Sequence, residues 1–388
     1  MTISHWMRKD LYHYQELSTD ILIVGAGYAG LSAAYWISEL RPDLKITLVD
    51  RTLSGAGASG RNAGFLTKGS AAFFRSLETK WGAEKSKAIY HFANDSLDLL
   101  QKHVLKASPE VTFEKTSSLT LIQNEQDLTS WSSFGQIESH YNFIFKAKDE
   151  LPSSLHKNFL GGYESEGEFK VNPIQLLSAL RKILESRNVE FQENSSVFEL
   201  TPEGILTENS SIKAKKIILA INGYFPEFSG SFAGIISPKR AQMLAVEIPE
   251  ELPCPHLYYD PAEKVYWRKA GEKMIVIGGK RLLDEAGENG DFEKISAVIQ
   301  DGLESYLTVK LELKYKVLKR WSGIMGFTEN ELPLIQKISS PVETYMIGGF
   351  SGHGMGFGFK SGLEVAEMVT GSKEKSFFDQ FGEVEIKL

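Results

Sequence analysis

The residues best suited to chemistry lie in glycine-rich segments, and the first of these, Gly25–Gly30, reads GAGYAG. It follows the apolar run Ile21–Val24 and precedes a helical pattern, and Asp50 stands 20 residues beyond Gly30. Glycines at this spacing allow a tight turn, backbone contact with a pyrophosphate, and close packing of helix on strand. The helix N-terminus attracts phosphates, and the Asp50 carboxylate can accept from a ribose hydroxyl. The pattern predicts a dinucleotide site; the alternative is a glycine-rich turn in an unrelated α/β protein.

Asp50 could bind the adenosine ribose of either FAD or NAD, so it does not distinguish the two cofactors. Two later segments favour FAD. Gly57–Phe65 (GASGRNAGF) has small residues that let backbone run close to a large flat ligand, and Arg61 could meet a phosphate. Gly348–Gly358 (GGFSGHGMGFG) predicts a second helix N-terminus, whose dipole would stabilise an anionic reduced flavin. His353 could add a donor or face the substrate. The alternatives are a flexible surface loop for the second segment and a structural turn role for His353.

The elements that position these segments begin with a βαβ unit from Asp20 to Asp50. Its predicted parts are a strand over Ile21–Val24, a helix over Tyr28–Leu40 and a strand over Ile46–Val49. The stretch 55–69 predicts no regular element, because it is rich in glycine, alanine and serine. Further predicted helices are 77–106, one starting at the Asn172-Pro173 cap, 292–307 and 359–369, and further predicted strands are 216–220, 243–248, 265–268, 274–277 and 345–347.

The predicted fold class is α/β (α+β), an FAD-binding Rossmann-like βαβ domain with an inserted antiparallel-sheet substrate domain. A chain of 388 residues is too long for one simple core, which favours two domains. We expect a discontinuous FAD-binding domain at 18–85, 152–235 and 318–388. The substrate domain is expected at 86–151 and 236–317.

Composition narrows the class of partner. A net charge of -7 argues against a nucleic-acid partner, which usually needs a basic face. The single cysteine, Cys254, allows no internal disulfide. No stretch approaches the ~20 apolar residues of a membrane span, and residues 1–20 lack the apolar stretch of a signal peptide. We expect a cytoplasmic protein with at most peripheral membrane contact and no metal site.

Taken together, the three segments resemble the D-amino-acid-oxidase superfamily of FAD-dependent oxidoreductases, and most of all its γ-glutamylputrescine oxidase branch. Other matching stretches are 171–173 (VNP), 266–268 (YWR) ahead of Gly278-Gly279, and 321–327 (WSGIMGF) with Pro333. Ala63 departs from the glycine common in relatives, and the acidic residue expected before Pro333 has no certain match. No cysteine lies in the flavin segments, so the cysteinyl linkage of some relatives is excluded and we expect noncovalent FAD.

The resemblance implies oxidation of a C–N bond by hydride transfer to flavin N5, with a small amine or amino acid as substrate and O2 or a quinone as acceptor. It makes Arg268 a candidate for a substrate carboxylate, against the alternative of a surface strand residue. His353 and Tyr266 are the other catalytic candidates, with Tyr266 a wall of the site or simply a packing residue. The residues predicted to bind FAD are Gly25, Ala26, Gly27, Tyr28, Ala29, Gly30, Asp50, Arg51, Ser59, Gly60, Arg61, Asn62, Ala63, Gly64, Val197, Asn222, Gly223, Gly349, Gly352, His353, Gly354 and Met355.

Two other functions remain open at this point. The first is an NAD(P)-linked dehydrogenase, which would share the fingerprint around Gly25. The second is a flavoprotein without amine turnover that serves as a binding module.

Overall fold

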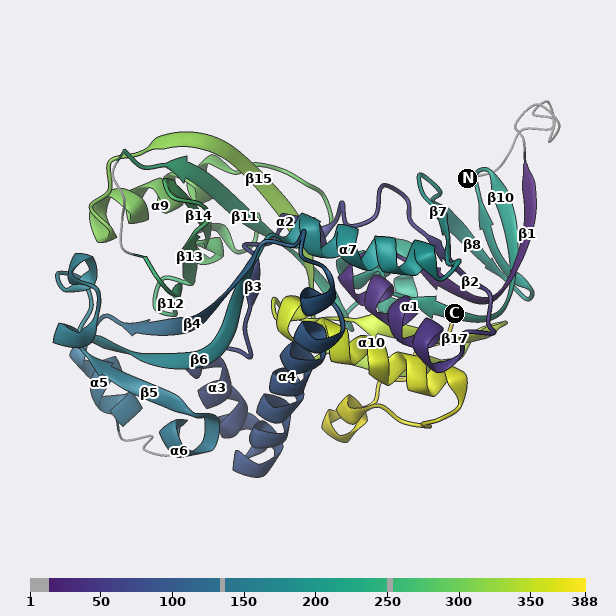
Figure 1. The fold of residues 1–388 in the computed structure, drawn as a ribbon, viewed down its shortest axis with the longest axis horizontal. Coiled ribbons are helices and arrows are strands. Elements are labelled where there is room, and N and C mark those ends of the chain that lie inside the picture. Colours follow the sequence, from purple (N-terminus) through teal and green to yellow (C-terminus); the bar gives the residue numbers. More distant parts are fainter. Residues whose placement is uncertain (1–13, 133–136, 250–253) are drawn as a thin grey trace.

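The computed structural model describes residues 14–132, 137–249 and 254–388. Of the N-terminal segment 1–20, residues 1–13 therefore lie outside the described residues. Two β-sheets, called sheet A and sheet B below, lie toward opposite ends of an elongated molecule, with helices between and around them (Figure 1). The structure thus confirms the predicted mixed α/β class with two sheets.

Sheet A contains the predicted βαβ unit. Its strand order is β16-β17-β10-β1-β2-β7, and β1 pairs in parallel with both β2 and β10. The buried run of β1 explains this central place, because a strand covered on both faces needs apolar side chains on both. The strands of sheet A are β1 (Gln15–Val24), β2 (Ile46–Val49), β7 (Glu190–Gln192), β8 (Val197–Thr201), β9 (Gly204–Thr207), β10 (Ser210–Leu219), β16 (Leu334–Ile338) and β17 (Glu343–Gly348).

Sheet B is antiparallel except where β12 pairs in parallel with β4. Its order is β15-β11-β14-β13-β12-β4-β6-β3, with β5 beside β6. The strands are β3 (Phe65–Leu66), β4 (Phe113–Ile122), β5 (Phe143–Ala147), β6 (Gly161–Val171), β11 (Ser237–Glu247), β12 (Leu257–Asp260), β13 (Val265–Lys269), β14 (Met274–Gly279) and β15 (Lys316–Phe327). The domain boundaries given above stay a prediction.

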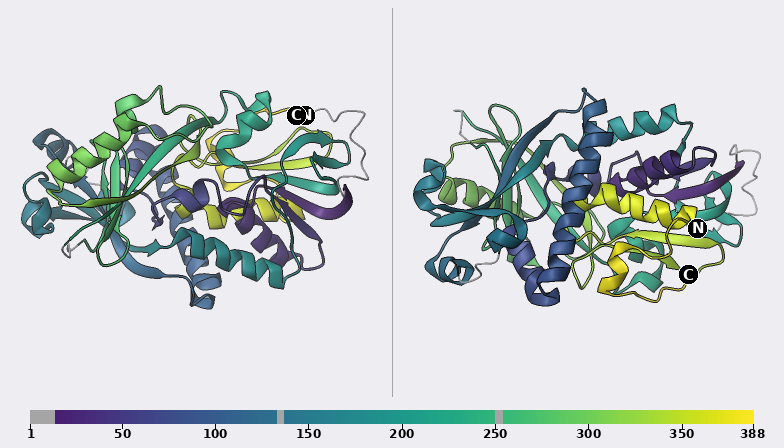
Figure 2. Two further views of the ribbon diagram at one scale, coloured as in Figure 1. Left: turned by 90° about the horizontal axis from the view of Figure 1, so that it is seen from above. Right: turned by 60° about the horizontal axis from the view of Figure 1, so that its bottom comes forward.

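The longer helices pack against one another. In the views of Figure 2, α4 lies beside α10, and α10 lies beside α1, which α7 flanks on its other side. Their apolar faces join one large core with strands of both sheets. The helices are α1 (Tyr28–Leu40), α2 (Ala58–Arg61), α3 (Ala71–Trp81), α4 (Ala83–His103), α5 (Glu125–Ser132), α6 (Ile137–Tyr141), α7 (Pro173–Ser186), α8 (Phe225–Phe228), α9 (Ala297–Ser305) and α10 (Gly354–Thr370).

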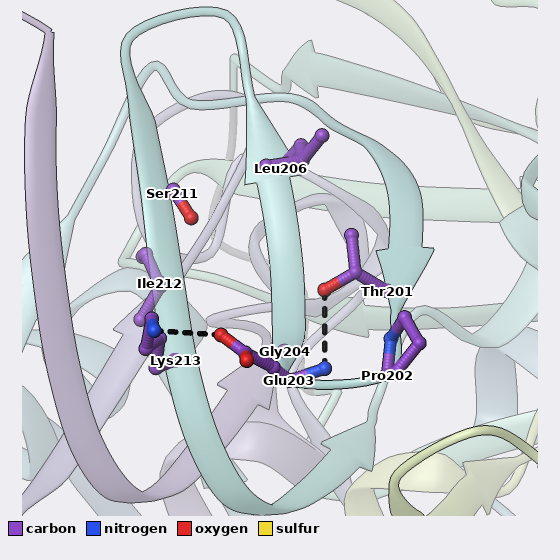
Figure 3. A pocket seen from close by; sticks show the side chains of 8 residues that line it. All are labelled: Thr201, Pro202, Glu203, Gly204, Leu206, Ser211, Ile212 and Lys213. Atoms are coloured by element: carbon purple, nitrogen blue, oxygen red, sulfur yellow. Dashed lines mark hydrogen bonds and ion pairs between the residues drawn. The ribbon is translucent and has the colours of Figure 1, made fainter.

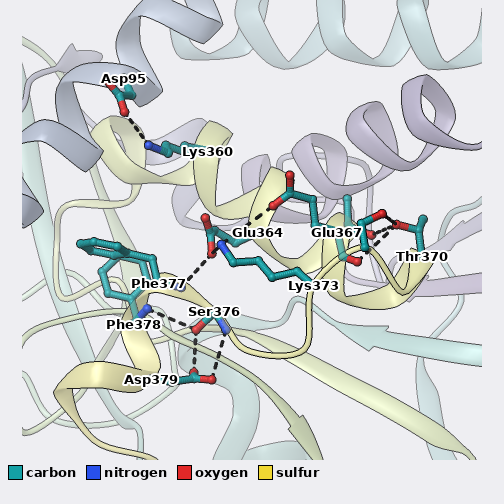
Figure 4. Close-up of polar contacts among 12 residues, drawn as sticks. Asp95, Lys360, Glu364, Glu367, Thr370, Lys373, Ser376, Phe377, Phe378 and Asp379 are labelled. Atoms are coloured by element: carbon teal, nitrogen blue, oxygen red, sulfur yellow. Dashed lines mark hydrogen bonds and ion pairs between the residues drawn. The ribbon is translucent and has the colours of Figure 1, made fainter.

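Polar contacts hold α10 in place (Figure 4). Lys360 pairs with Asp95 of α4 at 2.6 Å, which ties the two helices together. The Glu364 carboxylate accepts from the Lys373 ammonium and from the Phe377 amide, and so it anchors the chain beyond the helix. The start of α10, which carries the third glycine segment, is thereby fixed against α4. No helix in the described part of the chain has the length and apolar character needed to cross a membrane.

Several predicted elements match and others do not. The helix over Tyr28–Leu40 and the strand over Ile46–Val49 are confirmed, as is the cap of α7, where the Asn172 side chain accepts from two amides. The stretch 55–69 was wrongly predicted to lack regular structure, because it forms α2 and β3. The single helix predicted over 77–106 is two helices that meet at Gly82, whose φ is 78°. The helix predicted over 292–307 is shorter, since α9 begins at Ala297.

Candidate functional site

A cavity of about 450 Å³ opens at the carboxyl ends of β1, β2 and β10. In a sheet of parallel strands this edge is where nucleotides bind, because the helix N-termini and loops converge there. The lining residues are Val24, Gly25, Gly27, Val49, Asp50, Arg51, Thr52, Gly55, Ala56, Gly57, Ala58, Ser59, Arg61, Ser195, Ser196, Val197, Phe198, Ala220, Ile221, Asn222, Tyr224, Glu227, Phe228, Glu293 and Ile324.

The first glycine segment forms the floor of this cavity. A Cβ on Gly30 would stand 1.9 Å from the Gly25 carbonyl oxygen, so only glycine lets α1 pack this closely. Gly27 caps α1 with no side-chain acceptor for the first amides of the helix. Apart from the Tyr28 amide, the N–H groups of this first turn and the dipole are therefore available to a phosphate. The Tyr28 amide donates instead to the Ser59 hydroxyl at 2.9 Å, which links the first segment to the second.

Asp50 follows β2 and stands on the cavity wall. One carboxylate oxygen accepts from the Ala26 amide at 2.8 Å and the other from the Thr52 amide at 2.9 Å. These two bonds fix the carboxylate beside the glycine turn and leave lone pairs for further donors. The geometry suits the predicted acceptor for a ribose hydroxyl.

The second segment is held by its own polar side chains. Asn62 donates to the carbonyls of Ala58 and Ser59 and accepts from the Gly64 amide, so it closes the loop on itself. The Arg61 guanidinium donates to the Ala56 carbonyl at 2.7 Å and to the Ser322 carbonyl at 2.9 Å. Arg61 also pairs with Glu293 at 2.6 Å. It lines the cavity, but its contacts tie α2 to β15.

The third segment joins β17 to α10 and is bonded to Asn222, a residue of the cavity wall. The Asn222 side-chain oxygen accepts from the Gly349 amide at 3.0 Å, and Asn222 itself lines the cavity. The Ser351 amide donates to the Gly326 carbonyl at 2.8 Å, which fixes the segment against the end of β15. The predicted Gly223 packs beside Ile324 and Met325. Sheet A and sheet B therefore both contribute to this end of the site.

The structure corrects the predicted start of the last helix. It begins at Gly354, five residues before the predicted Phe359, so three glycines of the third segment, Gly354, Gly356 and Gly358, lie inside it. The glycines are needed for close packing rather than for a turn. A Cβ on Gly356 would stand 2.0 Å from the Thr67 carbonyl oxygen, and a Cβ on Gly358 would stand 2.7 Å from the Tyr28 ring.

His353 is the N-cap of α10. Its ring stacks on Phe73 with centroids 3.9 Å apart, and its Nδ1 is buried with no hydrogen-bond partner among the described residues. Burial lowers the pKa of His353 to about 4. The imidazole is therefore neutral near pH 7, and its free nitrogen is available to a ligand.

Arg268, the predicted partner of a substrate carboxylate, is held by backbone carbonyls. The residue is buried, and its guanidinium donates to three backbone carbonyls, those of Ala63, Val171 and Lys269. Burial lowers its pKa to about 10. These contacts brace the second glycine segment against β6. They use three of the five guanidinium N–H groups, so the binding of a substrate carboxylate by Arg268 stays a prediction.

Tyr266 lies on sheet B beside the second segment. Its ring meets the Phe65 ring edge-to-face at 5.9 Å, and its hydroxyl contacts the Met243 sulfur at 3.4 Å. Burial raises the pKa of Tyr266 to about 12, so the phenol keeps its proton. The position agrees with a wall of the site.

The cavity includes only some of the predicted residues. Of the predicted FAD-binding residues, those that line it are Gly25, Gly27, Asp50, Arg51, Ser59, Arg61, Val197 and Asn222. The others lie behind this surface or in the third segment. Sequence reasoning missed the wall formed by Phe198, Tyr224 and Glu227. Tyr224 stacks with Arg51 at 3.9 Å, and Glu227 pairs with Arg51 at 2.8 Å. For Tyr224 and Glu227 the only available signal was their position just after the carboxyl end of β10, whereas Phe198 lies on β8.

A second cavity, of about 310 Å³, lies among β8, β9 and β10 (Figure 3). Lys213 and Glu203 pair there at 2.6 Å. None of the glycine segments lines it, so we assign no function to it.

The residues at the main cavity fit a dinucleotide that carries a flavin. At the first βα turn the N-cap Gly27 leaves helix amides open to a phosphate, and Asp50 stands beside the turn. The second and third glycine segments both reach sheet B. These features define a class, the dinucleotide-binding flavoproteins. The particular family follows from comparison with known proteins. Residues 20–368 match the family described as FAD dependent oxidoreductase (DAO), and the chain belongs to that family. FAD is therefore the cofactor, rather than NAD(P).

Curated relatives and solved structures agree with this assignment. The chain is 25% identical to the probable oxidoreductase OrdL of Rhizobium meliloti (strain 1021), over 91% of this chain and 83% of that protein. It is 22% identical to the gamma-glutamylputrescine oxidoreductase of Escherichia coli (strain K12), over 95% and 87%. Glycine oxidase from Geobacillus kaustophilus has the same fold, with a TM-score of 0.79, 17% identity and coverage of 95% and 99%.

Proposed function

We propose that this FAD-dependent oxidoreductase oxidises the C–N bond of a small amine or amino acid. When bound, FAD supplies the hydride acceptor, N5, and the carbon beside the amine loses the hydride to give an imine that water hydrolyses. The relatives named above support the proposal, since two of them are named for an amine or an amino acid. O2 or a quinone then takes the electrons in the proposed cycle.

The observation that carries the proposal is that the second and third glycine segments both contact sheet B, where the second segment meets the aromatic side chain of Tyr266. Tyr266 lies against Phe65 at the end of the second segment, and the third segment is bonded to the end of β15. The His353 imidazole and the Tyr266 phenol are both uncharged near pH 7, so neither adds a charge beside a substrate that lies between sheet B and the flavin. Such surroundings favour the neutral amine that hydride loss requires.

The test begins with the absorbance spectrum of the purified protein and continues with anaerobic titration by amines and amino acids. We expect a bound flavin spectrum that bleaches with at least one member of the panel. Photoreduction of the same sample without substrate shows that the bound flavin can be reduced. If competent flavin stays oxidised with every amine, the chain is a flavoprotein without amine turnover, which is the remaining alternative.

A further inference from the structure

Glu293 brings a carboxylate into the FAD cavity from the chain between β14 and α9. The carboxylate pairs with the Arg61 guanidinium at 2.6 Å, and both side chains line the cavity. A carboxylate is unfavourable beside a pyrophosphate, because both groups are anions. Its place in a site for FAD therefore calls for a reason in the binding of the cofactor.

The other charges of the cavity wall leave Arg61 as the cation for the phosphates. The charged lining residues in the described part of the chain are two arginines and three acids, namely Asp50, Arg51, Arg61, Glu227 and Glu293. Two backbone amides hold Asp50 in the position expected for a ribose contact. Arg51, which directly follows Asp50, pairs with Glu227 at 2.8 Å and so lies at the ribose end. Arg61 is the remaining cation, and Glu293 offsets its charge.

Arg61 lies close to the turn that is expected to hold the phosphates. It shares the short helix α2 with Ser59, whose hydroxyl accepts from the Tyr28 amide at the start of α1. Its Nε and Nη1 donate to two backbone carbonyls, which hold the guanidinium independently of Glu293. The N–H groups of Nη2 have no partner among the described residues. A guanidinium fixed in this way is suited to a phosphate, which it binds through paired N–H donors.

The carboxylate sits on a stretch that can move while its two flanks stay anchored. Residues 293–295 make no backbone–backbone hydrogen bond within the described ranges. Both flanks are bound to β11, where the Phe292 carbonyl accepts from Arg240 at 3.2 Å and the Ser296 amide donates to the Gln242 side chain at 3.0 Å. The carboxylate side chain is 44% exposed, so it can turn from the cavity into water without breaking either anchor.

We propose that the phosphates of FAD replace the Glu293 carboxylate at Arg61, so that Glu293 is an internal competitor that lowers the affinity for the cofactor. The guanidinium stays in place during this exchange, and residues 293–295 turn the carboxylate outward. The exchange concerns FAD alone, and it does not depend on which substrate the chain oxidises.

The first test compares ligands with and without phosphate. Dissociation constants of FAD, FMN and riboflavin are measured by flavin fluorescence with the apoprotein of the wild type, Glu293→Gln and the exposed control Glu285→Gln. We expect Glu293→Gln to tighten FAD and FMN about three- to fivefold, the usual size for an ion pair of this exposure, and to leave riboflavin unchanged. The control should match the wild type. No gain for FAD, or an equal gain for riboflavin, would overturn the inference.

A double-mutant cycle shows whether Glu293 acts through Arg61. Arg61→Gln should weaken FAD, and Glu293→Gln added to it should bring no further gain, because no guanidinium is left to release. In Arg61→Lys, which keeps the positive charge, part of the gain should return. Thermal unfolding confirms that each variant is folded, since Arg61 also ties α2 to β15. If Glu293→Gln tightens FAD as much beside Arg61→Gln as in the wild type, Glu293 acts only as a general negative charge and the exchange is wrong.

A label on the moving stretch tests the exchange directly and needs no change at Arg61. A trifluoromethyl group is attached at Lys294→Cys, an exposed position, after the buried Cys254 is replaced by serine. FMN should shift the fluorine NMR signal, riboflavin should shift it less, and Glu293→Gln should show the shifted signal before FMN is added. If saturating FMN and riboflavin give the same signal, the carboxylate does not leave Arg61 for a phosphate.

Discussion

Glu168 is a carboxylic acid on β6 that is fully buried. Its nearest cation is Lys68, whose amide donates to the Glu168 carboxylate at 3.4 Å and whose ammonium donates to the Glu166 carbonyl at 2.6 Å. Burial raises the pKa of Glu168 to about 7, and the charge of Lys68 opposes this rise only in part. The carboxyl is therefore protonated in the folded chain at a pH where the unfolded chain has already lost the proton.

The free energy of unfolding should fall as the pH rises from 4.5 to about 7, and Glu168→Gln should abolish that fall. Between the usual pKa of 4.5 and about 7 the folded state holds one more proton than the unfolded state. The pKa difference is worth about 3 kcal/mol at most. Urea unfolding measures the free energy of unfolding of both proteins at pH 5 and pH 8. Relative to the wild type, Glu168→Gln should be more stable at pH 8 than at pH 5. The control is Glu166→Gln, at an exposed neighbouring position. If Glu168→Gln changes the free energy of unfolding equally at both pH values, this account is wrong.

At the residue scale the sequence predicts which side chains lie near the site better than it predicts their partners. Arg268 was correctly placed on a strand beside the flavin segments, but the three carbonyls that bind it come from residues far apart in sequence or from its neighbour.

At the element scale, the βαβ unit was predictable because its residues are local. Buried strand, glycine turn and buried helix follow one another within about 30 residues, as this unit requires. The start of α10 was not predictable, because glycine has a low helix propensity and the sequence does not show what the helix packs against. The helix needs glycines because the carbonyl of Thr67 and the ring of Tyr28 approach it too closely for a Cβ. Both residues lie on distant parts of the chain.

Gly30→Ala tests whether close packing at the first turn is needed for FAD. The new Cβ would stand 1.9 Å from the Gly25 carbonyl, so α1 must move away from the turn that presents its amides. Such overpacking costs about 1–3 kcal/mol, and we expect FAD affinity to fall at least tenfold. Flavin fluorescence during titration of the apoprotein measures the change. Gly230→Ala is a matched control, because no atom lies within 4 Å of its added Cβ; equal affinities in the two variants would contradict the packing argument.

On the scale of the whole molecule, the cofactor segments tie the two sheets together. The first segment follows β1 of sheet A, whereas the second leads into β3 of sheet B, and the third is bridged to β15 of sheet B. The sequence predicted the two kinds of sheet from their patterns. It could not show that β3 and β15 join the second sheet, because strand pairing over such separations leaves no local pattern.

Removing FAD should therefore destabilise the whole chain rather than one part of it. Ligand present at about 1,000 times its Kd adds about 4 kcal/mol. With an unfolding entropy of about 2.1 cal/mol/K per residue, this raises the Tm of a chain of 388 residues by about 5 °C. Calorimetry of the apoprotein with and without added FAD should show a single transition that moves upward as a unit. ADP should give a smaller shift, because it reaches the first segment but not the segments beside sheet B. Two transitions of which only one responds to FAD would show that the segments do not couple the sheets.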